Sequence, residues 1–207
     1  RSDMKVEGNL NLPQSSGDVD RFIRQLRIGK EAGIEIFHTV LGPRRYEAFA
    51  TLSDFEQWKS TVRRMVELAE TSARKVGVKI AIENHQDLQI AEWLELMKTI
   101  SSPQMGLCLD TSSSLGLLEL PLDVVRQLAP YTFSVHLSDL ALHQVEDGFE
   151  MVVAPLGQGS LDLPELLRVL RSVAPQVEYH LKMPTVAAQS IPCLRDSYWK
   201  TMPDKSG

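Results

Sequence analysis

Three predicted strands of the chain each end in a residue type that binds metal ions or moves protons. These residues are Glu83, Asp110 and His136, in the segments 78–85, 105–111 and 132–139. Apolar side chains alternate with small or polar ones in each segment, which is typical of a β-strand. One acid at a strand end is more often a helix cap or a loop anchor, but three metal-ligand types at equivalent positions favour a site. Two carboxylates and an imidazole suit Mn²⁺, Co²⁺, Mg²⁺ or Zn²⁺.

A fourth segment, 177–183, places three ionisable side chains on one face. Glu178, His180 and Lys182 alternate there with apolar residues. We expect this face to point into the interior of a barrel, with Lys182 at the mouth. Glu178 and His180 would lie deeper and form hydrogen bonds across the barrel, since interior polar groups need partners.

A repeating alternation of strand and helix patterns positions these residues. We expect strands at 4–12, 34–41, 78–85, 105–111, 132–139, 149–154 and 177–183, and helices at 18–33, 53–77, 88–100, 122–129 and 163–173. The helix at 53–77 would begin with a capping box of Ser53 and Glu56 and end at Gly77. This alternation implies a parallel sheet, either doubly wound or closed into a barrel.

Two observations favour the closed form, the α/β (β/α)8 or TIM barrel. No G-x-G-x-x-G motif follows a strand, which argues against a dinucleotide-binding sheet. A complete barrel needs about 250 residues, and the chain has 207. We therefore expect a single TIM-barrel domain over residues 1–207 that lacks its first strand and helix. Glu83, Asp110 and His136 would then lie on the C-terminal face, where such barrels carry their active sites.

Composition excludes several classes of protein. The chain is 43% hydrophobic with a formal net charge of −5, and its basic residues are scattered, which argues against a nucleic-acid partner. No apolar run approaches the 18 or so residues of a membrane span, and the first residues lack the apolar core of a signal peptide. Cys108 and Cys193 are far apart and predict reduced thiols in a cytoplasmic protein. We expect Cys108, on the interior face, to serve packing.

Five stretches of the sequence resemble one known family. They are KIAIENHQD, MGLCLDTSSS, FSVHLSDLAL, PLGQGSLDLPELL and IPCLRDSYW. Together they are similar to the sugar phosphate isomerase/epimerase family, whose members are xylose-isomerase-like TIM barrels. The resemblance implies a small-molecule carbohydrate as partner and a divalent metal held by Glu83, Asp110, His136 and a second glutamate. It also implies substrate contacts from His85, a loop at Gly157 and Gly159 that closes near the substrate, and a homo-oligomer.

The sequence departs from the family at the second glutamate. Relatives typically read L-E-M near the end of the last strand, whereas this chain reads Leu181–Lys182–Met183. In the family the two glutamates bind metal and act as an acid–base pair. Here Glu83 and Lys182 become the candidate catalytic residues. Lys182 could replace the metal by pairing with Glu83 or Asp110, swing away from a three-ligand metal, or act as a base or Schiff-base amine.

These observations leave three functions open. The first is isomerisation or epimerisation of a small sugar or keto-sugar, and the second is a lyase, decarboxylase or hydrolase reaction on a sugar acid. The third is sugar binding without catalysis. An abasic-site endonuclease shares the barrel but needs several metals, more histidines and a basic face.

His38 and Arg45 follow the strand pattern at 34–41 and could hold a substrate phosphate or carboxylate, the alternative being a solvated loop.

Overall fold

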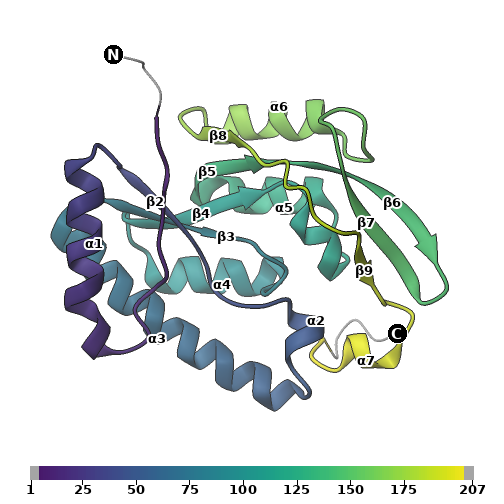
Figure 1. Cartoon of the computed structure of the whole chain (residues 1–207), viewed down its shortest axis with the longest axis horizontal. Coiled ribbons are helices and arrows are strands. Elements are labelled where there is room, and N and C mark those ends of the chain that lie inside the picture. The colour runs from purple at the N-terminus through teal and green to yellow at the C-terminus, as the bar shows by residue number, and fades with distance from the viewer. Residues whose placement is uncertain (1–4, 203–207) are drawn as a thin grey trace.

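The computed structural model describes residues 5–202. It contains a parallel sheet, a smaller antiparallel sheet and the helices that pack on them (Figure 1). The parallel sheet has the strand order β1-β2-β3-β4-β5-β8, and the second sheet has the order β6-β7-β9. The strands are β1 Gly8–Asn9, β2 Ile36–Val40, β3 Lys79–Glu83, β4 Met105–Asp110, β5 Thr132–Leu137, β6 Asp139–Val145, β7 Gly148–Ala154, β8 Glu178–Leu181 and β9 Gln189–Ile191. The α-helices are α1 Val19–Glu31, α2 Arg45–Ala48, α3 Leu52–Val76, α4 Ile90–Ile100, α5 Pro121–Leu128, α6 Leu163–Val173 and α7 Asp196–Trp199.

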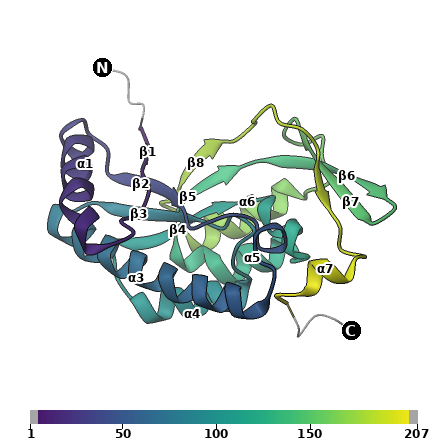
Figure 2. The same ribbon diagram turned by 60° about the horizontal axis from the view of Figure 1, so that its bottom comes forward.

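The six parallel strands form a curved half-barrel, and the helices α1, α3, α4, α5 and α6 cover its outer face (Figures 1 and 2). Apolar residues of the helices and of the outward-facing strand positions form the main core. Leu26 of α1, Val66 of α3, Ile82 of β3 and Leu107 of β4 are fully buried there. Each such side chain stabilises the fold by about 1.5–3 kcal/mol. The TIM-barrel prediction is therefore confirmed, in a form with fewer strands than expected.

The number of barrel strands was predicted wrongly. Segment 149–154 is part of a strand, β7, but it pairs antiparallel with β6 and lies outside the barrel sheet. The chain leaves β5 and turns back on itself in a hairpin at Glu146 and Asp147, between the paired residues Val145 and Gly148. The described sheet therefore has six barrel strands, two fewer than a closed barrel. Met4, included in the first predicted strand, lies outside the described residues.

The start of α3 also differs from the prediction. Thr51 is the N-cap, and its side-chain oxygen accepts a hydrogen bond from the backbone N–H of Asp54 at 3.1 Å. The carboxylate of Asp54 accepts from the N–H of Thr51 in return, also at 3.1 Å. The capping box is thus formed by Thr51 and Asp54 in place of Ser53 and Glu56. Gly77 ends the helix in the left-handed conformation with φ of 75°, as predicted.

The second sheet and α7 pack together beside the mouth of the half-barrel (Figure 2). A separate small core joins them and consists of Leu117, Leu140, Met151, Ile191, Tyr198 and Met202. An exposed segment, residues 183–188, leads from the end of β8 to β9. None of the described helices has the length and apolar character required to cross a membrane.

Candidate active site

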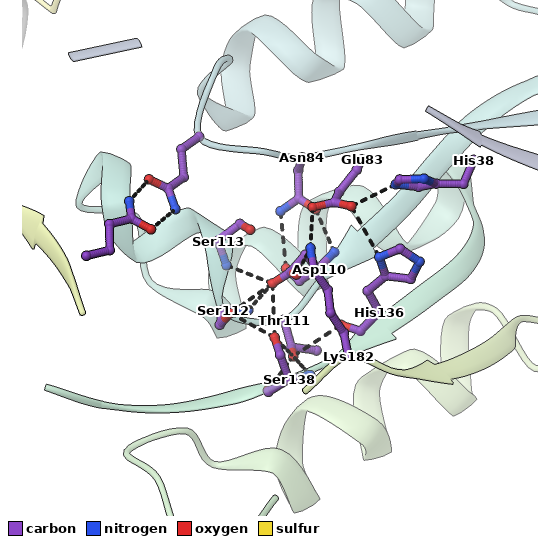
Figure 3. Close-up of polar contacts among 12 residues, drawn as sticks. His38, Glu83, Asn84, Asp110, Thr111, Ser112, Ser113, His136, Ser138 and Lys182 are labelled. Carbon is purple, nitrogen blue, oxygen red and sulfur yellow. Dashed lines mark hydrogen bonds and ion pairs between the residues drawn. The ribbon is translucent and has the colours of Figure 1, made fainter. Parts of the chain in front are cut away.

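Parallel pairing brings the predicted residues to one edge of the sheet. Glu83 lies opposite Cys108 in the register of β3 and β4, and Asp110 lies opposite His136 in the register of β4 and β5. Lys182 directly follows β8, and its backbone N–H donates to Leu137 O of β5 at 2.9 Å. The side chains of these strands converge at the C-terminal mouth of the half-barrel (Figure 3).

Lys182 lies between the two predicted carboxylates. Its Nζ is 2.6 Å from Oε1 of Glu83 and 2.9 Å from Oδ2 of Asp110. Burial alone would lower the pKa of Lys182, but the charges of Asp110 and Glu83 outweigh it and raise that pKa above its ordinary value. Lys182 is therefore an ammonium with two carboxylate partners, which is the first of the three arrangements considered above.

Glu83 is surrounded by hydrogen-bond donors. Its Oε2 pairs with Nε2 of His38 at 2.7 Å and with Nδ1 of His136 at 3.2 Å, while Oε1 pairs with Lys182. Burial would raise the pKa of Glu83, but the hydrogen bonds from His136 and His38 and the charge of Lys182 hold it well below its usual range. The carboxylate is therefore ionised, and both of its oxygens are occupied.

His136 lies between two acids, one of which the sequence reasoning missed. Its Nε2 pairs with Oε2 of Glu7 at 3.1 Å, and Glu7 also accepts a hydrogen bond from Ser134 Oγ at 2.5 Å. Burial lowers the pKa of His136, but hydrogen bonds with Cys108, Glu7 and Glu83 raise it to about 12. The sequence could have pointed to Glu7, because it is an acid at an inward-facing position of the first predicted strand.

Hydroxyl and backbone groups hold Asp110 in place. Its Oδ1 accepts from the backbone N–H groups of Ser112 at 2.8 Å and Ser113 at 2.9 Å, and from the hydroxyl of Ser138 at 3.1 Å. Asn84 pairs with the Asp110 backbone through its side-chain amide. These contacts together orient the carboxylate so that Oδ2 faces Lys182.

The metal site predicted by the resemblance does not fit these residues. Glu83 and Asp110 already have a cation between them, the Lys182 ammonium. An ion bound by both carboxylates would need the place that this ammonium occupies, so Lys182 would first have to leave the site. Another group among the described residues could hold a metal ion. It comprises His38, Glu83, Cys108 and His136, whose ligand atoms all lie within 4.8 Å of one another.

The predicted substrate-binding residues are more scattered. His85 follows β3, and its buried Nδ1 has no hydrogen-bond partner among the described residues. Arg45 is 3% exposed and donates to Thr201 and Glu92. Because this guanidinium is engaged in a buried network, we assign it a structural role in place of the predicted substrate contact. His38 reaches the centre of the site through Glu83.

Gly157 and Gly159 hold a loop on Asp139. Their backbone N–H groups donate to Oδ2 of Asp139 at 3.0 and 2.9 Å. Gly157 has a φ of +78°, and a Cβ at Gly159 would lie 2.1 Å from Oδ1 of Asp139. These contacts account for both glycines without a substrate.

The deeper residues of β8 only partly match the prediction. Glu178 has a partner, Lys5 at 2.6 Å, but that lysine is 72% exposed, so the contact lies at the surface and not in the interior. The Nε2 of His180 is buried without a hydrogen-bond partner among the described residues, so the hydrogen bond predicted for it is not formed there. Its ring lies edge-on to that of His136, with centroids 6.1 Å apart.

The chain is a parallel α/β half-barrel, and its acids, imidazoles and lysine lie at the C-terminal ends of the strands. This is where TIM-barrel enzymes carry their active sites. The model of the xylose isomerase-like TIM barrel family matches residues 8–196. The chain therefore belongs to that family, and the resemblance seen in the sequence is confirmed.

Known relatives extend this comparison. A 3-oxo-isoapionate decarboxylase of Pectobacterium atrosepticum is 28% identical over 97 residues, which is 46% of this chain and 35% of the relative. The matched parts thus span about a third of the curated relatives' lengths. The solved structure of the IOLI protein with a bound zinc atom has a TM-score of 0.63 and 18% identity, over 93% of this chain and 69% of that one. That of an L-ribulose 3-epimerase has a TM-score of 0.60 and 14% identity, over 86% and 62%. The structural likenesses concern the fold alone.

Proposed function

We propose that this chain acts on a small keto-sugar or keto-sugar acid by a reaction that passes through an enolate. The observation that carries this proposal is the Lys182 ammonium, which lies at the mouth of the half-barrel between Glu83 and Asp110. An ammonium at this place stabilises the negative charge that develops on a substrate carbonyl oxygen. In relatives with a second glutamate, a metal would supply that charge stabilisation.

Loss of CO₂ from a 3-keto sugar acid is the reaction that this geometry supports best. The bond between the carboxylate carbon and the α-carbon breaks, and its electron pair forms the enolate as the ketone oxygen becomes negative. CO₂ leaves, and a proton then returns to the α-carbon. The first step needs a cation at the ketone oxygen and no base. This suits a site in which Glu83, the base that the resemblance implies, has both oxygens occupied. The decarboxylase among the relatives supports the same reaction.

Isomerisation or epimerisation of a keto-sugar is the second candidate. Glu83 lies where the family resemblance places the catalytic base, and an epimerase shares the fold. Glu83 would have to release its donors before it could take a proton from carbon, because those donors lower its pKa. His85 is the residue best placed by resemblance to contact the substrate, and its unpartnered Nδ1 is free to do so.

Two assays run on the same substrates separate these reactions. The panel contains keto-sugars and their 3-keto acids, with CO₂ release measured alongside exchange of substrate C–H for deuterium in D₂O. We expect CO₂ release from a 3-keto acid, a loss of about 10²–10³-fold in kcat for Lys182→Met, and partial activity in Lys182→Arg. Glu83→Gln should retain CO₂ release to a larger degree than Lys182→Met.

Each other outcome has a defined meaning. Deuterium exchange without CO₂ release, abolished by Glu83→Gln, would favour the isomerase or epimerase. Saturable binding of these compounds with neither reaction would identify a binding protein that has lost the chemistry, and would contradict the proposal.

A further inference from the structure

We propose that His38, Glu83, Cys108 and His136 form a site for a zinc-type ion, deeper in the half-barrel than the Glu83–Lys182–Asp110 contact. These four residues differ from the set that the family resemblance predicted, because His38 and Cys108 replace Asp110 and the second glutamate. The site does not depend on the proposed reaction, since it is defined by ligand atoms and can be measured without a substrate.

The two oxygens of Glu83 face different partners. Oε1 faces Lys182, whereas Oε2 faces Nε2 of His38 at 2.7 Å and Nδ1 of His136 at 3.2 Å (Figure 3). A metal on the Oε2 side would therefore leave the Lys182 contact in place. The Sγ atom of Cys108 completes the group, and the four ligand atoms all lie within 4.8 Å of one another.

The spacing of the four atoms suits tetrahedral coordination. With metal–nitrogen and metal–oxygen bonds of about 2.1 Å, neighbouring ligand atoms lie about 3.4 Å apart, and somewhat more when one is sulfur. The separations in the structure, from 2.7 Å to at most 4.8 Å, bracket this value. Metal binding would therefore require side-chain adjustments, including a wider separation of His38 Nε2 from Glu83 Oε2, which are 2.7 Å apart.

A second acid already orients His136 as a metal ligand. Glu7 Oε2 accepts from Nε2 of His136 at 3.1 Å, so Nδ1, which lies 3.2 Å from Glu83 Oε2, is the nitrogen that would give up its proton and bind the metal. Ser134 Oγ fixes the Glu7 carboxylate by donating to Oε1 at 2.5 Å. A carboxylate on the outer nitrogen of a ligand histidine is the usual support for zinc-bound imidazole.

Charge and surroundings favour the same ion. A thiolate from Cys108 and the Glu83 carboxylate together balance a dication, while Lys182 balances Asp110 at 2.9 Å. Cys108 is 0% exposed and packs with Ile36 and Ala81, so this side of the site is apolar and closed to water. Sulfur and imidazole ligands select Zn²⁺ or Co²⁺ over Mg²⁺ or Ca²⁺.

Titration of the metal-free chain with Co²⁺ tests the site directly. A thiolate ligand produces a near-ultraviolet charge-transfer band, and tetrahedral Co²⁺ produces intense visible bands. We expect both bands, reaching a plateau at one Co²⁺ per chain and lost when Zn²⁺ is added. Cys108→Ser should abolish the near-ultraviolet band, whereas Cys193→Ser, a matched control at a thiol outside the group, should keep it. Glu7→Gln should weaken Co²⁺ binding by about 10–100-fold.

The variant Asp110→Asn distinguishes this site from the one expected by resemblance. We expect it to keep both cobalt bands because Asp110 is not a ligand. Loss of Co²⁺ binding in Asp110→Asn together with its retention in Cys108→Ser would overturn the proposal. Absence of Co²⁺ binding by the unmodified chain would also overturn it. Urea unfolding of every variant, and of Cys108→Ala as a second substitution of the thiol, shows whether a variant that does not bind Co²⁺ is still folded.

Discussion

Replacement of Lys182 by methionine should destabilise the fold and make its stability depend differently on pH. The change keeps most of the side-chain volume but leaves Glu83 and Asp110 without the ammonium, and these carboxylates are only 3% and 2% exposed. Removal of one partner from a buried ion pair costs about 3–5 kcal/mol. Because Lys182 itself is 31% exposed, we reduce this figure to about 2–4 kcal/mol near pH 7.5.

The pH dependence follows from the carboxylates. The folded-state pKa of Glu83 lies below its ordinary value of 4.5, so the ion pair stabilises the fold above that pH and the contribution is lost as the pH falls. Without the ammonium, Glu83 keeps its hydrogen bonds with His136 and His38 but loses one of the groups that lower its pKa, so that pKa rises. The variant then takes up a proton on Glu83 at a higher pH than the unmodified chain does, and the difference in unfolding free energy should shrink as the pH falls.

Urea unfolding at about pH 7.5 and about pH 5 measures both effects. Lys5→Met is the matched control, because Lys5 pairs with Glu178 at the same distance of 2.6 Å but is 72% exposed. It should leave the unfolding midpoint nearly unchanged. A loss below about 1 kcal/mol in Lys182→Met at pH 7.5, or a loss that does not depend on pH, would refute a buried ion pair at Lys182.

Three further predictions concern residues away from Lys182. Gly159→Ala should destabilise the fold by about 1–3 kcal/mol in urea unfolding, because its Cβ would meet Asp139, whereas Gly17→Ala, with its nearest contact at 3.6 Å, should not. Arg45→Met should lower the thermal midpoint, since its buried guanidinium pairs with Glu92 at 2.7 Å; an unchanged midpoint would contradict its structural role, and the cobalt spectrum should stay the same. Burial raises the pKa of Asp87 to about 7, so the folded state loses stability as the pH rises through that value. Asp87→Asn should remove this loss and gain stability over the unmodified chain between about pH 5 and pH 8; a gain independent of pH would show that Asp87 is not the group responsible.

Much of the mouth of the half-barrel could be predicted from the sequence. Glu83, Asp110 and Lys182 each end a run of alternating residues, and parallel strands bring such ends together. The contact of Lys182 with both carboxylates could be predicted from this arrangement and from the attraction of opposite charges.

Other features depend on pairings that a single chain does not reveal. Segment 149–154 alternates as a barrel strand does, and only its antiparallel partner β6 distinguishes it. Thr51–Asp54 and Ser53–Glu56 are both capping-box patterns, so packing of the helix end chooses between them. Cys108 packs with Ile36 and Ala81, as predicted, but its proximity to His38 depends on side chains of β2 and β4 that meet across β3.

The ionisation of Lys182 tests the central claim of this account most directly. Carbon-13 NMR of the lysine Cε signals, followed through a pH titration and assigned with Lys182→Arg, reports the charge of each lysine. We predict that Lys182 still carries its proton at a pH above 10.5, the ordinary pKa of a lysine side chain. A Lys182 signal that titrates at or below that value would contradict an ammonium held between Glu83 and Asp110.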